Sequence, residues 1–338
     1  MMPNQPVDRT YSFGILGCGM IANVHASAIG ALSCGQLRGV ADKDPAAAER
    51  FAVQHGTRAY SDYEEMLSDP LVDVVCICTP SCFHVPNTLQ ALENGKHVVL
   101  EKPMAFRCAD ADRIIRACQQ VGKQVTVISQ LRFSEDVAKI KELLREGAFG
   151  RISLCSLRMN YYRSREYYAH SPWKGTKEFD GGGALMNQGI HGIDLLQYLM
   201  GPVKDVLGRT GTVCHDIEVE DTAVAALCFE SGALGVIEAS TCAYPGFERR
   251  IEIHGDQGYV ILSEDRIEKL MVRGEEVLVP AGSKTIRTAR DPRTMDCELH
   301  RRQIENFLAA IRGEVPSVMD ASEGRKAIDL MERIYGLR

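Results

Sequence analysis

The stretch that decides the fold is residues 13–22, Phe-Gly-Ile-Leu-Gly-Cys-Gly-Met-Ile-Ala. Its first four residues predict a short buried strand, and the pattern G-x-G-x-x-A follows at once. In this pattern the first glycine permits a tight turn, the second lets a pyrophosphate approach bare backbone, and the small last residue lets the helix pack closely on the strand. The N-terminus of that helix offers free N–H groups to an anion. The residues expected to contact a dinucleotide are Gly17, Gly19, Met20 and Ile21.

An acidic residue ends the next expected strand. Asp42 lies 25 positions after Gly17. A carboxylate at this place accepts hydrogen bonds from the adenosine ribose hydroxyls and repels a 2′-phosphate. The sequence therefore favours NAD as the cofactor over NADP, although Lys43 next door weakens the preference.

Short apolar runs alternate with amphipathic stretches as far as about residue 130. Ser61 and Glu64 predict a capping box at one helix start, and Gly95 and Gly122 predict left-handed C-caps at two helix ends. Regular alternation of strand and helix predicts an α/β domain with a doubly wound parallel sheet, a Rossmann domain over residues 10–130. The expected strands are residues 13–16, 37–41, 72–78, 97–100 and 125–129.

The alternation of predicted strands and helices ends in the second half of the chain. Several expected strands follow one another without helices between them, which predicts an antiparallel sheet. We expect an α+β domain over residues 131–338, with a large open-faced sheet covered by helices on one face. The expected strands are residues 152–159, 219–229, 233–239, 250–254 and 259–263, and the expected helices are 137–145, 184–200, 294–312 and 321–335.

Composition limits the class of protein. Hydrophobic residues make up 45% and charged residues 25% of the 338, which is typical of a globular protein. A net charge of −6 argues against a nucleic-acid partner. No apolar run approaches the roughly 18–20 residues of a membrane span. We therefore expect a protein that is soluble and binds neither nucleic acid nor membrane.

The twelve cysteines predict free thiols. Several lie inside apolar runs, where a thiol packs as a small hydrophobic group. No C-x-x-C pair occurs, so the usual spacing of a zinc site is missing and no metal site is expected. Residues 1–10 are polar and have no apolar signal core. The expected location is the reducing cytoplasm.

Further motifs along the chain resemble those of a known protein family. The pattern T-P-S…H…A-L…G-K-H-V…E-K-P and the later block G-G-G-A-L-M-N-Q-G-I-H-G-I-D resemble the glucose–fructose oxidoreductase, inositol dehydrogenase and rhizopine-catabolism (Gfo/Idh/MocA) family. The motifs extend over residues 12–200. The matching residues are Thr79-Pro80-Ser81, His84, Ala91-Leu92, Gly95-Lys96-His97-Val98, Glu101-Lys102-Pro103 and residues 181–194.

The resemblance implies an NAD-dependent oxidoreductase of carbohydrates and suggests further cofactor contacts. It also suggests a cis bond before Pro103, and it places the segment of Gln130 and Arg132 beside the nicotinamide and substrate. The cofactor contacts added in this way are Thr79, Pro80, His84, Glu101, Lys102 and Gln130.

Three residues are the expected catalytic group. Lys102 follows the carboxyl end of a strand, where open α/β sheets place ligand chemistry, and its cation can stabilise an alkoxide. The resemblance assigns His191 as the general base, a role that suits the near-neutral titration of histidine. Asn187 lies four residues earlier on the same helix face. Family members commonly have Asp there, whereas Asn-Gln resembles the branch that oxidises sugar rings at C3.

Residues 158–177 are basic and aromatic in an acidic chain. Aromatic faces stack on sugars, and arginine pairs with carboxylate or phosphate. A contact between subunits is an equal alternative, because Tyr, Trp and Arg are enriched at interfaces. The expected substrate contacts are Lys102, Arg132, Tyr161, Arg163, Trp173, Asn187 and His191.

The leading hypothesis is an NAD(H)-dependent dehydrogenase of a pyranose-type sugar, sugar acid, glycoside or nucleotide sugar, acting at a ring hydroxyl, with the hydroxyl at C3 as one candidate. One alternative is glycoside elimination through a transient 3-keto sugar with recycled NAD. Another is a non-catalytic sugar sensor on the same fold. Relatives usually associate through the second-domain sheet, so a homodimer or homotetramer is expected.

Overall fold

A six-stranded parallel sheet carries the first half of the chain in the computed structural model, which describes residues 9–170, 173–279 and 296–337. The strand order is β3-β2-β1-β4-β5-β6, and β1 pairs with both β2 and β4 in parallel. This order confirms the doubly wound sheet. The strands are β1 Tyr11–Leu16, β2 Gly35–Ala41, β3 Arg58–Ala59, β4 Val74–Ile77, β5 His97–Leu100 and β6 Val125–Val127.

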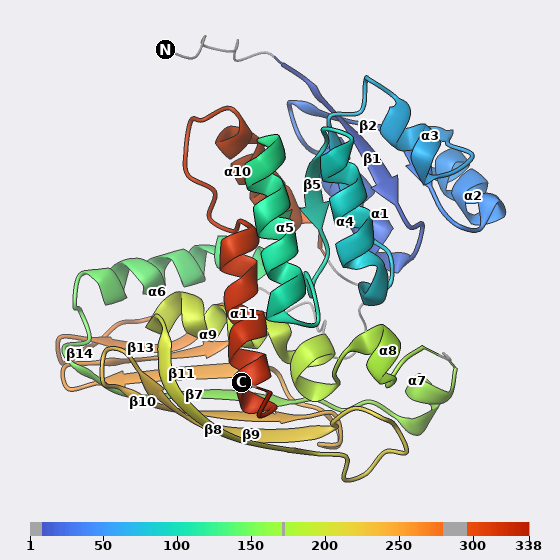
Figure 1. Ribbon diagram of the computed structural model, residues 1–338. Helices are drawn as coiled ribbons and strands as arrows, with labels where there is room; N and C mark the ends of the chain where they lie inside the picture. Colours follow the sequence, from blue (N-terminus) through green and yellow to red (C-terminus); the bar gives the residue numbers. More distant parts are fainter. Residues whose placement is uncertain (1–8, 171–172, 280–295, 338) are drawn as a thin grey trace. The chain divides into compact units, whose positions relative to one another are not determined.

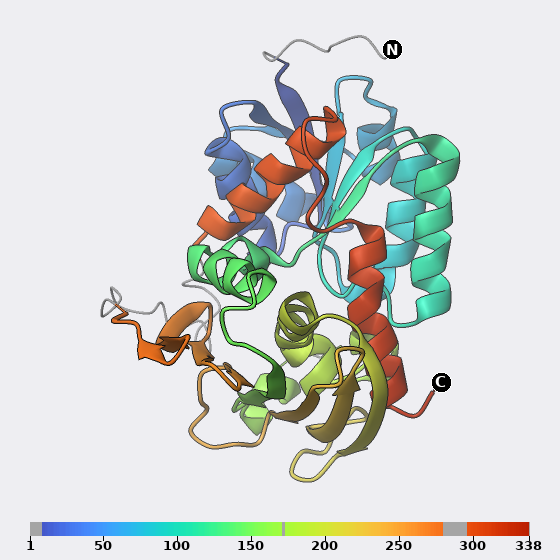
Figure 2. The same cartoon turned by 90° about the vertical axis from the view of Figure 1, so that its left-hand side faces the viewer.

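Helices cover both faces of this sheet (Figure 2). The helices α4 and α5 lie on one face, and α1 lies on the other beside α10. The hydrophobic cluster beneath α1 includes Phe13, Ile15 and Ile29. The helices are α1 Met20–Gly30, α2 Pro45–His55, α3 Tyr63–Ser68, α4 His84–Glu93, α5 Cys108–Val121 and α10 Glu298–Ile311.

The helix α10 does not follow the expected division of the chain. The chain forms two units, and the first takes residues up to Gln130 together with a later segment that ends at Arg325. The reason is packing, because Ile304, Phe307 and Leu308 of α10 are buried in the core of the first unit. The second unit starts at Leu131 and takes the rest of the chain.

Local signals in the first unit are mostly confirmed. Gly95 and Gly122 have φ values of +71° and +66°, as the left-handed C-caps require. The capping box is wrong by one residue. Asp62 caps α3 by accepting the Glu65 N–H at 2.8 Å, and the Glu65 carboxylate accepts the Ser61 N–H at 2.7 Å.

The second unit is built on an eight-stranded sheet in the order β14-β13-β12-β11-β7-β10-β9-β8. All neighbours are antiparallel except β7 and β10. Figure 1 shows α6 and α9 on one side of this sheet, which confirms the mostly antiparallel layer with helices on one face. The elements are α6 Glu135–Arg145, β7 Ile152–Asn160, α7 Arg165–Ala169, α8 Lys177–Asp180, α9 Ile190–Met200, β8 Val203–Gly211, β9 Thr222–Phe229, β10 Leu234–Ser240, β11 Arg250–Gly255, β12 Tyr259–Ser263, β13 Arg266–Val272, β14 Glu275–Glu276 and α11 Ala321–Ile334.

The helix expected over residues 184–200 is not regular along its length. Ala184–Gly189 forms a π-helical turn, with the Gln188 N–H donating to Gly183 O at 3.2 Å, and α9 follows. Glu220 stabilises the turn because its carboxylate accepts the N–H groups of Gly183 and Leu185 at 2.9 and 2.8 Å. The turn lies immediately before His191, and single π turns often mark functional positions. No helix among the described residues is long and apolar enough to cross a membrane.

Candidate active site

The glycine turn of the first unit presents bare backbone. Gly17 has a φ of +91°, and a Cβ there would lie 2.8 Å from Cys78 O, so only glycine fits. A Cβ on Gly19 would meet no atom within 4 Å, and no side chain caps α1 at this residue. The first turn of α1 therefore faces open space with its N–H groups available. This arrangement fits a pyrophosphate.

Asp42 is fixed in place beside this turn. Its carboxylate accepts the Cys18 N–H at 2.7 Å and the Asp44 N–H at 2.9 Å. The side chain follows β2 directly and is partly exposed. Both oxygens are thereby oriented and still have lone pairs for the two hydroxyls of a ribose.

Glu101 turns into the protein, contrary to the expected cofactor contact. It is 6% exposed, and its Oε1 lies 2.8 Å from Nε2 of His25 on α1. Its Oε2 accepts the backbone N–H of Lys102 at 3.2 Å. Burial acts to raise the pKa of Glu101, but the hydrogen bond and charge of His25 lower that pKa to about 2. Glu101 therefore holds the backbone at Lys102 from the protein interior.

His25 is the charged partner of this pair. Its burial opposes the charge, but Cys76, Cys78 and Glu101 outweigh burial and raise the His25 pKa well above 6.5. His300 on α10 packs edge-on against it, with the ring centroids 5.7 Å apart. Burial and the charge of His25 lower the His300 pKa to about 4. The two buried imidazoles thus take opposite protonation states.

The pair makes stability depend on pH. Because the Glu101 pKa is lowered in the folded state to about 2, its contribution is present above about pH 4.3, the ordinary Glu value, and is lost as pH falls towards 2. The raised His25 pKa has the opposite sign, and its contribution is retained at acidic pH. We expect the free energy of unfolding to fall by roughly 1–2 kcal/mol more in the wild type than in Glu101→Gln between pH 5 and 3. Urea titrations at the two pH values measure this difference. The exposed Glu146→Gln should follow the wild type, and equal slopes for wild type and Glu101→Gln would contradict the assignment.

His84 also differs from expectation. It is 1% exposed, and its ring nitrogens lie 2.6 Å from Pro103 O and 2.9 Å from Thr79 O. Burial lowers its pKa. The ring therefore ties the loop after β4 to the loop after β5, and direct contact with a cofactor does not fit this burial. Thr79 and Pro80 are more exposed and flank the glycine turn through Cys78.

Lys102 and Gln130 of the first unit have polar side-chain atoms that fit the expected contacts with a ligand. Lys102 is partly buried after β5, and the Lys102–Pro103 bond is cis, as the resemblance suggested. Gln130 is 9% exposed, and its buried Oε1 has no hydrogen-bond partner among the described residues. A buried acceptor without a partner is costly, so it fits a ligand that donates a hydrogen bond.

Arg132, expected at the substrate, forms a buried ion pair instead. Its Nε and Nη2 donate to the two oxygens of Asp194 at 2.9 and 2.6 Å, and its guanidinium lies 4.6 Å above the centroid of Tyr198. The two side chains are 2% and 6% exposed. Bidentate pairing of this kind fixes α9 to the start of the second unit.

Asn187 has an acidic partner that the sequence did not reveal. Its Nδ2 donates to Oδ1 of Asp180 at 2.7 Å, and Asp180 is 4% exposed. The other oxygen of Asp180 accepts the Gly175 N–H at 2.6 Å. The amide is therefore turned so that its oxygen is directed away from Asp180. His191 lies one turn further along, at the start of α9, and is partly buried.

The residues of the basic, aromatic stretch 158–177 lie in different surroundings, some in the core and some nearer the surface. Tyr161 is 7% exposed, and burial raises its pKa to about 12, so it is a core residue and not a surface for a sugar. Arg163 donates to Gln188 Oε1 at 2.7 Å and so stands beside the π-helical turn. Trp173 is 37% exposed, and Lys174 lies over its ring at 5.7 Å.

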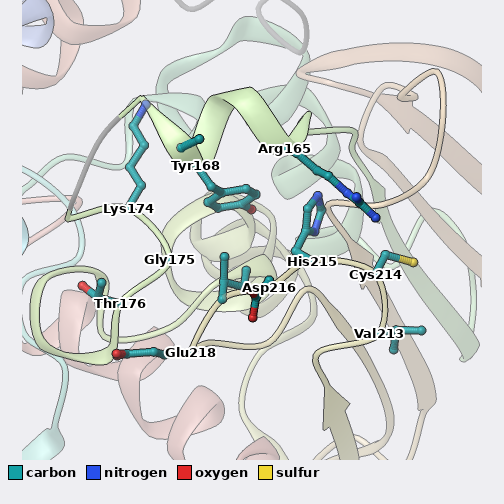
Figure 3. Close-up of a pocket in the computed structure, with 12 residues that line it drawn as sticks. Arg165, Tyr168, Lys174, Gly175, Thr176, Val213, Cys214, His215, Asp216 and Glu218 are labelled. Atoms are coloured by element: carbon teal, nitrogen blue, oxygen red, sulfur yellow. The ribbon is translucent and has the colours of Figure 1, made fainter.

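A pocket of about 710 Å³ opens within the second unit. Figure 3 shows Arg165 and Tyr168 on one side of it and the loop of His215 and Cys214 on the other. Lys174 lies at its edge, with its ammonium 3.8 Å from the ring centroid of Tyr167. The pocket lining combines cations, an aromatic ring and polar backbone, as a polar ligand requires.

Models of known protein families match both units of the chain. Residues 11–129 match the family model described as the oxidoreductase family with an NAD-binding Rossmann fold, and residues 137–261 match the GFO/IDH/MocA C-terminal domain. The chain is 27% identical to myo-inositol 2-dehydrogenase of Thermotoga maritima, over 93% of this chain and 92% of the relative. It is 26% identical to D-glucoside 3-dehydrogenase of Escherichia coli, over 95% and 93% of the two chains.

A solved structure agrees over nearly the whole length. The WlbA dehydrogenase from Bordetella pertussis, in complex with NADH and UDP-GlcNAcA, has 33% sequence identity and a TM-score of 0.87. The match covers 98% of this chain and 96% of that one. With both family models matched in order and their expected glycine turn and Asp42 in position, this chain belongs to the Gfo/Idh/MocA family of NAD-dependent oxidoreductases.

Proposed function

We propose that this protein is an NAD(H)-dependent dehydrogenase of a nucleotide-linked sugar acid and that it acts on the ring hydroxyl at C3. The observation that carries the proposal is the 33% identity, over 98% of the chain, with a dehydrogenase whose crystals hold NADH and UDP-GlcNAcA. The cations Arg163, Arg165 and Lys174 support an anionic substrate. The relative named as a D-glucoside 3-dehydrogenase supports C3 as the carbon that is oxidised.

The reaction converts a secondary alcohol to a ketone. When bound, NAD⁺ accepts the hydride from the carbon that carries the hydroxyl. We assign His191 to remove the hydroxyl proton and Lys102 to hold the oxygen as negative charge develops there. Asn187, oriented by Asp180, offers its amide oxygen to a neighbouring hydroxyl of the sugar. Gln130 Oε1 offers a buried acceptor to the bound ligands.

Absorbance at the NADH band tests the proposal directly. Purified protein with NAD⁺ is given UDP-GlcNAcA, UDP-GlcNAc, myo-inositol and methyl glucoside in parallel. We expect the nucleotide-linked acid to give the highest kcat/KM, and NMR of the product to show a ketone at C3. Equal rates with the neutral sugars would contradict the sugar-acid specificity. Glycoside cleavage without net NADH would support elimination through a 3-keto sugar, and binding without turnover would support a sensor.

Asp42 gives a test of cofactor choice that needs no substrate. The Asp42→Asn variant keeps an acceptor for the Cys18 N–H but loses the charge that repels a 2′-phosphate. We expect the ratio of the Kd for NADPH to that for NADH to fall by about tenfold or more, equivalent to about 1.4 kcal/mol. Fluorescence titration of both cofactors measures it. Asp44→Asn, two residues further along, is the matched control and should leave the ratio unchanged.

We also propose that copies of the chain associate through the uncovered face of the eight-stranded sheet. Leu154 and Leu234 pair directly on β7 and β10 and are 47% and 57% exposed. Apolar side chains on such a face favour association. Light scattering should give the mass of a dimer or tetramer, and Leu154→Lys with Leu234→Glu should reduce it. An unchanged mass would contradict this assignment.

A further inference from the structure

Three side chains of metal-ligand type meet at one end of the second-unit sheet. His215 lies in the loop between β8 and β9, Asp221 immediately precedes β9, and Cys242 follows β10. The pairing of β9 with β10 and the bond from the Thr241 N–H to Asp221 O bring the last two together. None of the three belongs to the catalytic group assigned above.

Two separations between the ligand atoms match those around a tetrahedral zinc ion. Nδ1 of His215 lies 3.4 Å from Sγ of Cys242 and 3.3 Å from Oδ2 of Asp221. All three ligand atoms lie within 4.8 Å of one another. Zinc bond lengths to sulfur, nitrogen and oxygen, taken at a tetrahedral angle, require about 3.5 Å between sulfur and nitrogen and about 3.4 Å between nitrogen and oxygen.

The orientation of His215 is already fixed. Its Nε2 lies 2.9 Å from Arg163 O, and because a carbonyl only accepts, Nε2 carries the hydrogen. This is the contact by which metal-ligating histidines are oriented in proteins. In the neutral ring, Nδ1 then presents its lone pair to Sγ of Cys242 and to Oδ2 of Asp221, an oxygen that also accepts the N–H groups of Cys214 and His215 at 2.8 and 2.9 Å. Asp221 is 0% exposed, so water does not screen the His215–Asp221 pair.

We propose that His215, Asp221 and Cys242 bind a zinc ion. One sulfur, one imidazole and one carboxylate at these separations favour Zn²⁺ over Mg²⁺ or Ca²⁺, which prefer oxygen ligands. Three protein ligands leave the fourth position of a tetrahedral zinc ion to water.

The zinc ion would hold one wall of the pocket. Val213–Glu218 lines the pocket opposite Tyr168, whose ring centroid lies 4.9 Å from that of His215 (Figure 3). Asp221 already anchors this wall by accepting the N–H groups of Val213 and Cys214, each at 2.8 Å. The metal adds a link from the wall to Cys242 after β10. Sequence spacing could not reveal the site, because Cys242 is separated by β9 and β10 from the loop that carries His215 and Asp221.

The metal content of the full-length protein tests the proposal. Protein without a histidine tag is purified from zinc-supplemented medium, and zinc is measured by inductively coupled plasma mass spectrometry. We expect about one zinc per chain, and a loss of at least fivefold in Cys242→Ser and in His215→Asn. Cobalt substituted into the wild type, without NADH present, should show the visible bands of tetrahedral, thiolate-bound Co²⁺.

Matched controls separate ligand loss from unfolding. Cys228→Ser changes a partly buried cysteine of β9 outside the cluster and should keep the full zinc content. Circular dichroism confirms that each variant is folded, and the cobalt spectrum of the wild type needs no variant at all. Absence of zinc and of the cobalt bands from the wild type would overturn the proposal. So would loss of two free thiols as a Cys214–Cys242 disulfide, or unchanged zinc in both ligand variants.

Discussion

Replacing His191 by asparagine is expected to lower kcat by roughly 10²–10⁴-fold, the usual contribution of a positioned general base. Asparagine keeps a polar side chain of smaller volume but cannot accept the hydroxyl proton. The KM should change little, because the base acts on the proton that moves in the transition state. Steady-state kinetics with the best substrate of the panel, followed by NADH absorbance, measure both constants.

The pH profile distinguishes a base from a structural histidine. In the wild type, kcat should decline on the acidic side of neutrality, because an imidazolium cannot accept a proton. The His191→Asn variant should lose this decline, and added imidazole should recover part of its rate. His254→Asn, which changes a half-exposed histidine of β11, should behave as the wild type. A variant that keeps the wild-type pH profile at reduced rate would show that His191 is not the base.

Residues near one another in sequence were enough to predict the first unit. The turn at Gly17, the strand periods and the left-handed glycines at Gly95 and Gly122 depend on a few consecutive residues. The short β3 and the strand β8 were not predicted, because they lack a strong apolar pattern and are held by their neighbours. The assignment of α10 also depends on tertiary packing, since Phe307 is buried against segments nearly 300 residues earlier.

The site was predictable only where the motif was local. Lys102, Asn187 and His191 are proposed from the resemblance, but Asp180, which accepts a hydrogen bond from Asn187, lies in an irregular segment without a motif. The π-helical turn was not predicted because its stabilising carboxylate, Glu220, comes from a distant part of the chain. Arg132 was taken for a substrate contact because the sequence cannot show that Asp194 is its partner.

Breaking the ion pair between Arg132 and Asp194 gives the largest expected loss of stability. Replacing Arg132 by methionine should lower the free energy of unfolding by about 3–5 kcal/mol, because it leaves the Asp194 carboxylate buried without a counter-ion. The side chain of Asp194 is only 6% exposed, so water cannot replace the two hydrogen bonds that are lost. Methionine keeps the length of the side chain and its packing on Tyr198. Urea unfolding followed by circular dichroism measures the change.

Two further variants decide whether the cost comes from the isolated charge. The double variant Arg132→Met with Asp194→Leu removes both charges and should recover most of the stability, since a buried pair is often no better than apolar residues of similar volume. Arg158→Met breaks an ion pair with Glu252 in which the arginine is 44% exposed, and surface pairs contribute about 1 kcal/mol or less. If Arg132→Met and Arg158→Met cost the same, the Arg132–Asp194 pair does not fix α9. A large loss of stability in Arg132→Met, a small loss in Arg158→Met and recovery in the double variant would together support one role for Arg132. It holds the helix that carries His191 and does not bind the substrate.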